Sequence, residues 1–482
     1  MSVLHLPPLP AAGGRQHWSN LSGASLSLAI AEAARRASSL TLVLTPDSQS
    51  AERLEDELAF FAPQLPVLQF PDRETLPYDL FSPHQDISSQ RIATLCRLPE
   101  LDRGVLVVPL STALHRLAPP GFLLGSSLML DTGQKLDAAA LRSRLEAAGY
   151  RCAETVYEHG EFAIRGALID LFPMGSDQPF RIDLFDDDIE SLRTFDPETQ
   201  RSTRTVEQIR LLPAREFPLH KDAISAFRNR FREHFDVDFR RCPVYQDLSS
   251  GITPAGIEYY LPLFFDQVAT LFDYLPGNTQ VFSLPGIEQA AETFWTDVRS
   301  RYEERRHDPE RPLLPPAELF LPVEDCFARL KRWPRVIADP ASAGPGQECF
   351  PCQSMPALAI DARASEPLGA LRHYLEHFPG RVLFTAESAG RREVLLELLG
   401  RLKIRPQAFD SWPDFLAGGQ RLGISIAGLQ EGLPLDSLAV VAESQLFGQR
   451  VMQRRRREQN RDNGENVIRN LIELHEGVPV VH

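Results

Sequence analysis

The hydrophobic pattern is clearest between residues 165 and 201. Apolar and polar residues alternate through Ala167 to Phe172 and again through Phe180 to Phe185, which is the period of half-buried strands. The intervening sequence MGSDQP carries the glycine and proline of a turn. This stretch therefore predicts two adjacent strands, and we expect the rest of the chain to be organised around them.

One face of the second strand is predicted to be polar. It carries Arg181, Asp183 and Phe185, while the alternate positions 180, 182 and 184 are apolar. Such a face offers a cation and an aromatic ring to a protein partner. The alternative is that the arginine is solvated or paired with nearby carboxylates, at Asp183 or at residues 186–188, because exposed strand arginines commonly are.

The first part of the chain, residues 1–124, has the pattern of an α/β unit. The predicted elements are helices at 27–36 and 52–61, buried strands at 40–46 and 104–110, and a helix that begins near Ser88. Ser111 is expected to cap a short helix after the second strand. Strands separated by helices imply a parallel sheet.

Residues 125–212 form a strand-rich insert. It begins with a helix at 137–148, which we expect to end at Gly149. In residues 213–340 a charged helix at 217–235 is followed by α/β patterning over 256–286 and a long helix at 287–304. The insert is therefore predicted to interrupt one domain that lies on both sides of it.

The remaining sequence predicts a linker, a small α/β domain and a polar tail. Residues 341–356 lie in a stretch rich in Pro, Gly, Ala and Ser, which is typical of a linker. In residues 357–450 the predicted elements are helices at 368–378 and 390–402 and strands at 381–386, 423–427 and 438–443. Residues 451–482 read as a linker helix with four arginines, Arg454 to Arg457, which either face solvent or contact DNA.

Composition limits the classes of function. A chain of 482 residues has material for three or four domains, and its net charge of −14 excludes a broad surface for nucleic acid, so that any DNA contact would be local. No leader peptide or apolar run of spanning length is present, which predicts a cytoplasmic protein with free thiols and no membrane partner. Cys349 and Cys352 have the spacing of a zinc or redox pair, but without a second pair a loop with two thiols is favoured.

An α/β domain raises the question of nucleotide binding. A phosphate loop needs glycines, a lysine for the β- and γ-phosphates and a hydroxyl for magnesium. The candidate at residues 21–27, LSGASLS, offers Gly23 and Ser25 but no lysine. The strand ending at Phe282 runs into SLPG, without the acidic pair that would hold magnesium. We therefore expect no bound cofactor, no metal and no catalytic residue in this chain.

Several long motifs carry a family resemblance. They are LPYDLFSPHQDISSQRIATL at 76–95, EHGEFAIRGALIDLFPMG at 158–175, LFDDDIESLRTFD at 184–196, TPAGIEYY at 253–260 and RPLLPP at 311–316. With these the chain resembles the N-terminal region of the transcription-repair coupling factor (Mfd) family. Members of that family are DNA translocases that remove stalled RNA polymerase and recruit nucleotide excision repair.

The resemblance also extends to the repair helicase UvrB, in which a UvrA-binding domain is inserted into a helicase-like domain. It implies a multidomain α/β protein: a degenerate helicase-like parallel-sheet domain in two parts, an inserted α+β domain that binds UvrA, and a small α/β domain of unknown role. The motif match implies that UvrA is contacted by Arg165, Arg181 and Phe185, with the neighbouring Asp170, Asp186 and Asp187 as further candidates.

The departures from UvrB imply what this region does not do. The loop at 21–27 lacks its lysine, and residues 78–92 leave no room for the aromatic hairpin with which UvrB probes damage. The resemblance also implies that the chain is an N-terminal fragment, so that ATP, Mg²⁺, RNA polymerase and duplex DNA would be bound by motor and polymerase-binding domains beyond its end near residue 482. The alternative is a nucleotide-dependent helicase that is active in this chain itself.

Overall fold

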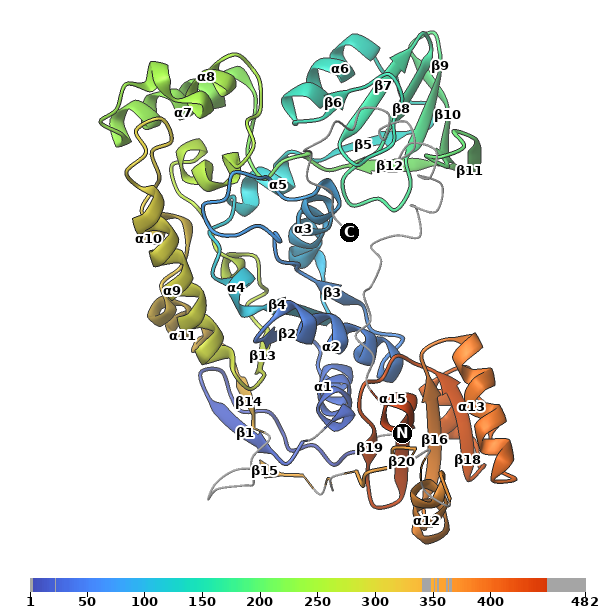
Figure 1. Ribbon diagram of the computed structural model, residues 1–482. Helices are drawn as coiled ribbons and strands as arrows, with labels where there is room; N and C mark the ends of the chain where they lie inside the picture. The colour runs from blue at the N-terminus through green and yellow to red at the C-terminus, as the bar shows by residue number, and fades with distance from the viewer. Residues whose placement is uncertain are drawn as a thin grey trace, which may run out of the picture.

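The computed structural model describes residues 3–21, 23–339, 348–350, 352, 355–360, 363 and 366–448. Figure 1 shows a large domain in the centre, with an inserted domain at its upper right and a small domain at its lower right. The predicted multidomain α/β architecture is confirmed. The arginine run at 454–457 lies outside the described residues.

The large domain is built on a seven-stranded sheet in which every neighbouring pair of strands is parallel. The strands, in spatial order, are β15 (Glu348–Cys349), β1 (Arg15–Ser19), β14 (Arg335–Asp339), β13 (Gln280–Ser283), β2 (Leu40–Thr45), β4 (Gly104–Pro109) and β3 (Val67–Gln69). Strands from both sides of the insert are neighbours in this sheet: β1 lies between β15 and β14, and β13 pairs with β2. The chain therefore leaves this sheet and returns to it after the insert.

Helices surround this sheet, because its central strands β2 and β4 are buried along their whole length and need cover on both faces. The α-helices are α1 (Ala24–Arg36), α2 (Ser48–Phe61), α3 (Gln85–Arg97), α4 (Leu110–Ala113), α5 (Pro120–Gly125), α7 (Lys221–His234), α8 (Pro243–Ser249), α9 (Ile287–Arg305), α10 (Pro316–Leu319) and α11 (Val323–Leu330). Short 3₁₀ helices connect them: η1 (Leu98–Glu100), η2 (Phe239–Arg241), η3 (Ile257–Phe264) and η4 (Leu271–Asp273).

The inserted domain is a curved sheet packed on one helix, α6 (Ala138–Ala147). Its six-stranded sheet has the order β11 (Ser202–Val206), β10 (Asp188–Phe195), β9 (Phe180–Phe185), β8 (Leu168–Leu171), β7 (Glu161–Arg165) and β6 (Arg151–Cys152). A separate pair, β5 (Leu128–Asp131) and β12 (Gln208–Leu211), joins this domain to the large one. The two predicted strands are β8 and β9, and they pair directly in antiparallel fashion.

The small domain has its own five-stranded sheet, in the order β17 (Gln407–Ala408), β18 (Leu422–Ile426), β16 (Arg381–Ala386), β20 (Leu438–Ala442) and β19 (Leu433–Pro434). Its helices are α12 (Gly369–His377), α13 (Ala389–Arg401), α14 (Trp412–Ala417) and α15 (Glu443–Phe447). One face of this sheet has a hydrophobic core of its own. The other face shares a core with α1 and α2 of the large domain.

Three local expectations differ from the structure. Ser111 does not cap a helix: α4 already begins at Leu110, and the Ser111 hydroxyl instead lies 3.4 Å from a carboxylate oxygen of Asp72. The α/β pattern near residue 256 is the 3₁₀ helix η3, which contains Pro262. Part of the stretch expected to be a linker, residues 348–349, is the edge strand β15, which pairs with β1.

Candidate functional site

The candidate site is the outer face of the six-stranded sheet. Strand register places Ile169 opposite Ile182, and these side chains are buried on the inner face in the core. The next positions, Asp170 and Arg181, are also paired and lie on the opposite, outer face. Arg193 of β10 is in turn paired with Arg181. The outer face therefore collects charged residues from neighbouring strands.

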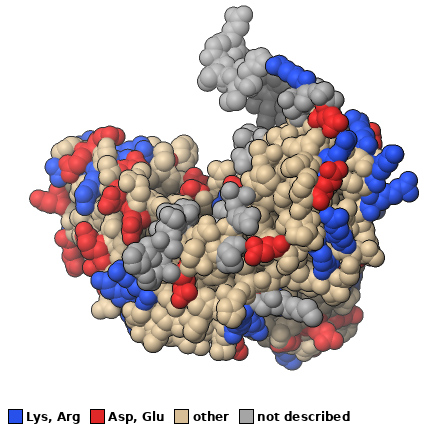
Figure 2. All heavy atoms as spheres, turned by 90° about the horizontal axis from the view of Figure 1, so that it is seen from below, with Lys and Arg blue, Asp and Glu red and all other residues tan. Residues whose placement is uncertain are grey.

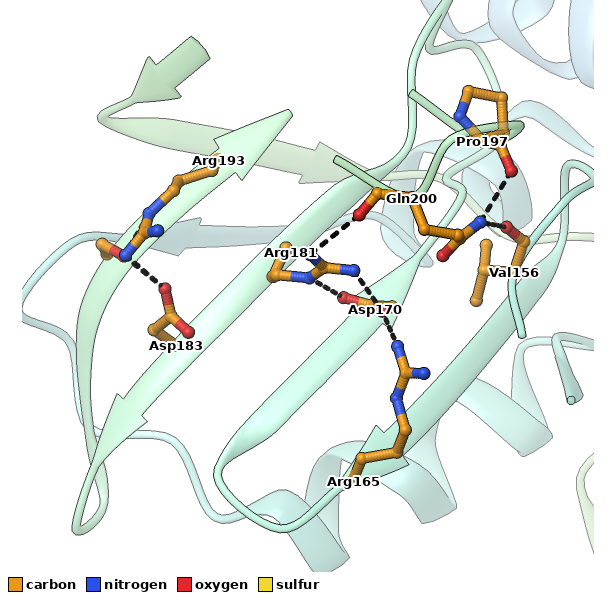
Figure 3. A network of polar contacts seen from close by, with 9 residues as sticks. Val156, Arg165, Asp170, Arg181, Asp183, Arg193, Pro197 and Gln200 are labelled. Atoms are coloured by element: carbon orange, nitrogen blue, oxygen red, sulfur yellow. Dashed lines mark hydrogen bonds and ion pairs between the residues drawn. The ribbon is translucent and has the colours of Figure 1, made fainter. Parts of the chain in front are cut away.

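Asp170 organises this face. Its side chain is completely buried, and its two oxygens accept hydrogen bonds from Arg181 Nε at 2.7 Å and Nη2 at 2.9 Å. A guanidinium nitrogen of Arg165 also donates to the same carboxylate. Figure 3 shows the two arginines converging on Asp170 from different strands. A buried carboxylate needs such partners, because an unpaired charge in the interior is costly.

Arg181 is held on every side by the protein. Beyond its two bonds to Asp170, its Nη1 donates to the carbonyl oxygen of Gln200 at 3.2 Å, and its guanidinium lies 4.9 Å from the centre of the Phe195 ring. The hydrogen bond to Asp170 raises the pKa of Arg181. Only 17% of the side chain is exposed. Arg181 is therefore well placed to orient its neighbours and poorly placed to reach a partner.

Arg165 is the more accessible arginine. It ends β7, next to the tight turn at Gly166 (φ +64°), and 49% of its side chain is exposed. Only one of its nitrogens, Nη2, donates to Asp170. A guanidinium has five N–H donors in a planar fork. Arg165 is thus held in position by one nitrogen while about half of its side chain stays accessible.

Phe185 lies at the tip of the β9–β10 hairpin, with 69% of its surface exposed. It pairs with Asp188, so that Asp186 and Asp187 form a two-residue turn. Asp186 adopts φ +53°, as this kind of turn requires of an Asn, Asp or Gly. Both turn residues are exposed. A ring of this size left in solvent beside charged groups is available as an anchor for a protein partner.

A second ion pair on the same face was not anticipated from the sequence. Arg193 lies 2.7 Å from an oxygen of Asp183, and the Ser191 hydroxyl donates to the same carboxylate at 2.8 Å. The alternative considered above was that Arg181 pairs with Asp183 or with residues 186–188. Arg181 is paired with a carboxylate, as that alternative expected, but the partner is Asp170, because β8 brings Asp170 alongside Arg181 and β10 brings Arg193 alongside Asp183. Only strand pairing decides these partners.

The two residues of the candidate phosphate loop lie elsewhere, at the start of α1. Gly23 adopts φ +56° directly before the helix, and Ser25 is completely buried in its first turn. Strand β13, whose end would supply acidic residues, ends at Ser283 and leads through Leu284 and Pro285 into α9. These positions are separate from the outer face of the inserted sheet.

In the described part of the chain, no group of three or more His, Cys, Asp or Glu side chains is arranged so that it could hold a metal ion. Cys349 is exposed and Cys352 is buried, and both are free thiols.

Among the helices that the structure describes, none is long and apolar enough to cross a membrane. On the face drawn in Figure 2, Lys and Arg occur together with Asp and Glu, separated by uncharged residues.

Comparison with known proteins places two segments of this architecture in families. Residues 128–217 match the UvrB interaction domain, and residues 374–446 match the domain described as MFD, D3 domain. The first segment contains the whole outer face described above. The second covers most of the small domain.

Relatives extend along nearly the whole chain. The transcription-repair-coupling factor of Escherichia coli (strain K12) is 46% identical over 480 residues, which is 98% of this chain and 42% of the relative. That of Haemophilus influenzae is 44% identical over 463 residues, 95% of this chain and 40% of the relative. That of Bacillus subtilis (strain 168) is 26% identical over 488 residues. The chain spans about two-fifths of the length of these proteins, and over that span it belongs to the transcription-repair-coupling factor family.

Proposed function

We propose that this chain is a nonenzymatic module that recruits UvrA through the outer face of its inserted sheet. The observation that carries the proposal is the arrangement around Asp170: a buried carboxylate orients Arg165 while Phe185 stands exposed on the same face. The match of this segment to the UvrB interaction domain supports the choice of partner. In the longer protein, the module would connect RNA polymerase stalled on DNA to excision repair.

The recognition chemistry follows from which groups remain available. Arg165 would form a charge-assisted contact to an acidic group of UvrA, and Phe185 would enter an apolar depression beside it. Asp170 and Arg181 would act from within the sheet, since their polar atoms are used by each other. The exposed carboxylates of Asp186 and Asp187 would contribute at the rim, where charges affect the association rate more than the affinity.

The test is a titration of UvrA onto the full chain. Phe185→Ala is expected to raise the dissociation constant by about 30-fold, which corresponds to about 2 kcal/mol for a central aromatic anchor. Arg165→Ala should raise it by about tenfold. The matched control is Val394→Ala in the small domain, because Val394 is also an exposed apolar residue, with 46% of its surface accessible. Unchanged affinity in Phe185→Ala would refute the assignment of this face.

The nonenzymatic part of the proposal has its own measurement. The candidate phosphate loop offers Gly23 and Ser25 without a lysine, and the hydroxyl of Ser25 is buried. We expect steady-state ATP hydrolysis by the chain to equal that of buffer. Hydrolysis above buffer that is lost in Ser25→Ala would contradict the proposal and would favour a helicase active in this chain.

A further inference from the structure

The start of α1 is covered by the small domain. The backbone N–H of Ala24 donates to the carbonyl oxygen of Gly432, at 3.3 Å. A Cβ atom placed on Gly23 would lie 2.6 Å from that same oxygen and 3.2 Å from Oε2 of Glu431. No side chain fits in this space, so glycine is required at position 23 both by its φ of +56° and by its neighbour. The contact joins segments from opposite ends of the described chain.

The position is one at which a helix attracts anions. The first N–H groups of a helix have no partner within it, and the helix dipole adds a partial positive charge there. Phosphate groups bind at such positions in nucleotide-binding loops. Here the Gly432 carbonyl oxygen and the Glu431 carboxylate lie at that end of α1. The chain therefore supplies its own oxygen atoms where a phosphate would lie.

The neighbouring hydroxyl groups are also used within the protein. Ser25 is completely buried, and its side chain is hydrogen-bonded with the Cys352 thiol. The hydroxyl of Ser27 donates to the buried carboxylate of Glu57, on α2. Burial raises the pKa of Glu57, and the nearby charge of Glu431 acts in the same direction. These hydroxyls therefore have protein partners and do not face a nucleotide.

The surrounding contact is apolar and well packed. Trp412 begins α14 of the small domain and is 1% exposed, and its ring lies 5.2 Å from that of Phe61 and 5.9 Å from that of Phe60. One hydrophobic cluster contains these rings together with Leu433 and much of α1. A continuous core of this kind holds two domains in a fixed arrangement, whereas mobile domain interfaces are smaller and more polar.

We propose that the small domain is a built-in occupant of the degenerate phosphate loop. Its segment Glu431–Gly432 closes the start of α1 from within the chain, and Trp412 anchors the contact. This gives the small domain a role that neither a spacer nor an independent module would have: it keeps the large domain in one arrangement without nucleotide. The inference is independent of the proposed binding of UvrA, which concerns the opposite end of the molecule.

Hydrogen exchange on the full chain tests this contact through Gly23→Ala, which adds a Cβ against the Gly432 carbonyl. The matched control is Gly251→Ala, because Gly251 has φ +80° and no atom within 4 Å of an added Cβ. Both variants place an alanine at a positive φ, but only the first adds an atom against the interface. Because Gly23 also has ψ −138°, a backbone conformation that strongly favours glycine, the loss of protection at residues 432, 433 and 435 is the part of the readout that reports the contact. We expect the amides of residues 24–27 and of residues 432, 433 and 435 to exchange about tenfold faster in Gly23→Ala, with no such change in Gly251→Ala.

Trp412→Ala approaches the same contact from the small domain and should expose the same two segments. Amides of β8 and β9 serve as the internal reference, because the inserted domain should remain as protected as in the unchanged chain. If both segments keep their protection in Gly23→Ala, or if α1 alone loses it in either variant, the small domain does not occupy this position. Either result would overturn the proposal.

Addition of ATP with Mg²⁺ provides a second readout. A closed position predicts that the exchange of residues 24–27 and of residues 432, 433 and 435 in the unchanged chain is the same with and without millimolar nucleotide. Nucleotide that protected the start of α1, or that released the segment around Gly432, would show that the position is open to ligands and would overturn the proposal. UvrA binding measured on the same samples should be unaffected by Gly23→Ala, so that failure of this inference is distinguishable from failure of the UvrA assignment.

Discussion

The outer face of the inserted sheet and the start of α1 use charged and polar groups in opposite ways. At the sheet, the buried Asp170 holds Arg165 and Arg181 in fixed positions, and Arg165 keeps donors in solvent. At α1, the carbonyl oxygen of Gly432 accepts the N–H of Ala24, and Glu431 lies beside Gly23, where a ligand would have to approach. The outer face therefore leaves polar groups accessible to a partner, whereas the polar groups at the start of α1 are bonded or covered within the chain.

This difference shows that polar residues alone do not locate a binding site. The start of α1 has the sequence position of a phosphate loop, yet its groups are satisfied internally. The outer face is made of ordinary strand residues, and it becomes a candidate because a buried carboxylate pre-orients an exposed arginine. The two regions therefore differ in how many of their polar groups remain accessible once the contacts within the protein are made.

The largest effect is expected for Asp170→Asn, on the outer face of the inserted sheet. The substitution removes the charge that holds two arginines and leaves Arg181, which is only 17% exposed, without its anion. We expect the free energy of local opening of β8 and β9 to fall by about 3 kcal/mol, as is usual when one partner of a buried ion pair is removed. Hydrogen exchange of these strands measures this loss. Protection equal to that of the unchanged chain would mean that Asp170 does not organise the face.

Two buried glutamates, Glu216 and Glu57, lie where the other two domains contact the large domain, and their pKa values are shifted in opposite directions. Glu216 follows β12 and binds Arg73 at 2.9 Å and Arg91 at 2.8 Å, both in the large domain. Burial alone would raise its pKa, but the charges of Arg91 and Arg73 outweigh burial and lower the pKa to about 2. Where the small domain packs against α2, burial raises the pKa of Glu57. The two domains are thus attached next to carboxyl groups with opposite shifts.

The two shifts predict opposite responses to acid. The stabilisation from Glu216 is present above the ordinary glutamate pKa of 4.5 and is lost as the pH falls toward about 2. That from Glu57 is fully present below 4.5 and is lost as the pH rises through its raised pKa. Between about pH 7 and about pH 3, we expect the contribution of Glu216 to fall by on the order of 2 kcal/mol and that of Glu57 to rise.

Urea unfolding of the unchanged chain, Glu216→Gln and Glu57→Gln at both pH values measures these contributions. The difference in the free energy of unfolding between Glu216→Gln and the unchanged chain should become smaller in acid, because protonation removes part of the stabilisation that the carboxylate provides and the amide does not. The free energy of unfolding of Glu57→Gln, relative to that of the unchanged chain, should be greatest at the higher pH. The same pH trend in both variants would contradict the opposite shifts.

The smallest effect is expected for Asp183→Asn, on the same face as Asp170. Its partner Arg193 is 44% exposed, and exposed ion pairs are worth less than about 1 kcal/mol. Exchange of β9 and β10 should therefore change by much less than in Asp170→Asn, and the affinity for UvrA should be nearly unchanged. A loss as large as that of Asp170→Asn would place the organising carboxylate at Asp183.

Local structure was predictable because short-range patterns determine it. Alternation predicted β8 and β9 and the polar face that carries Phe185, and buried apolar runs predicted β2 and β4. The site was only partly predictable. The motif match named Arg165 and Arg181 together, but it did not distinguish the exposed arginine from the one held within the sheet.

By itself, the sequence determined the buried strands β2 and β4, the paired strands β8 and β9, the motifs of the family and the lack of a lysine at residues 21–27. Only the tertiary structure decided that Asp170 is the partner of both arginines and that Gly432 lies against Gly23. The physical reason is that periodicity reports which side of an element is buried, whereas ion pairs and close contacts depend on strand register and domain packing between distant residues. The outer face and the closed start of α1 both result from such packing.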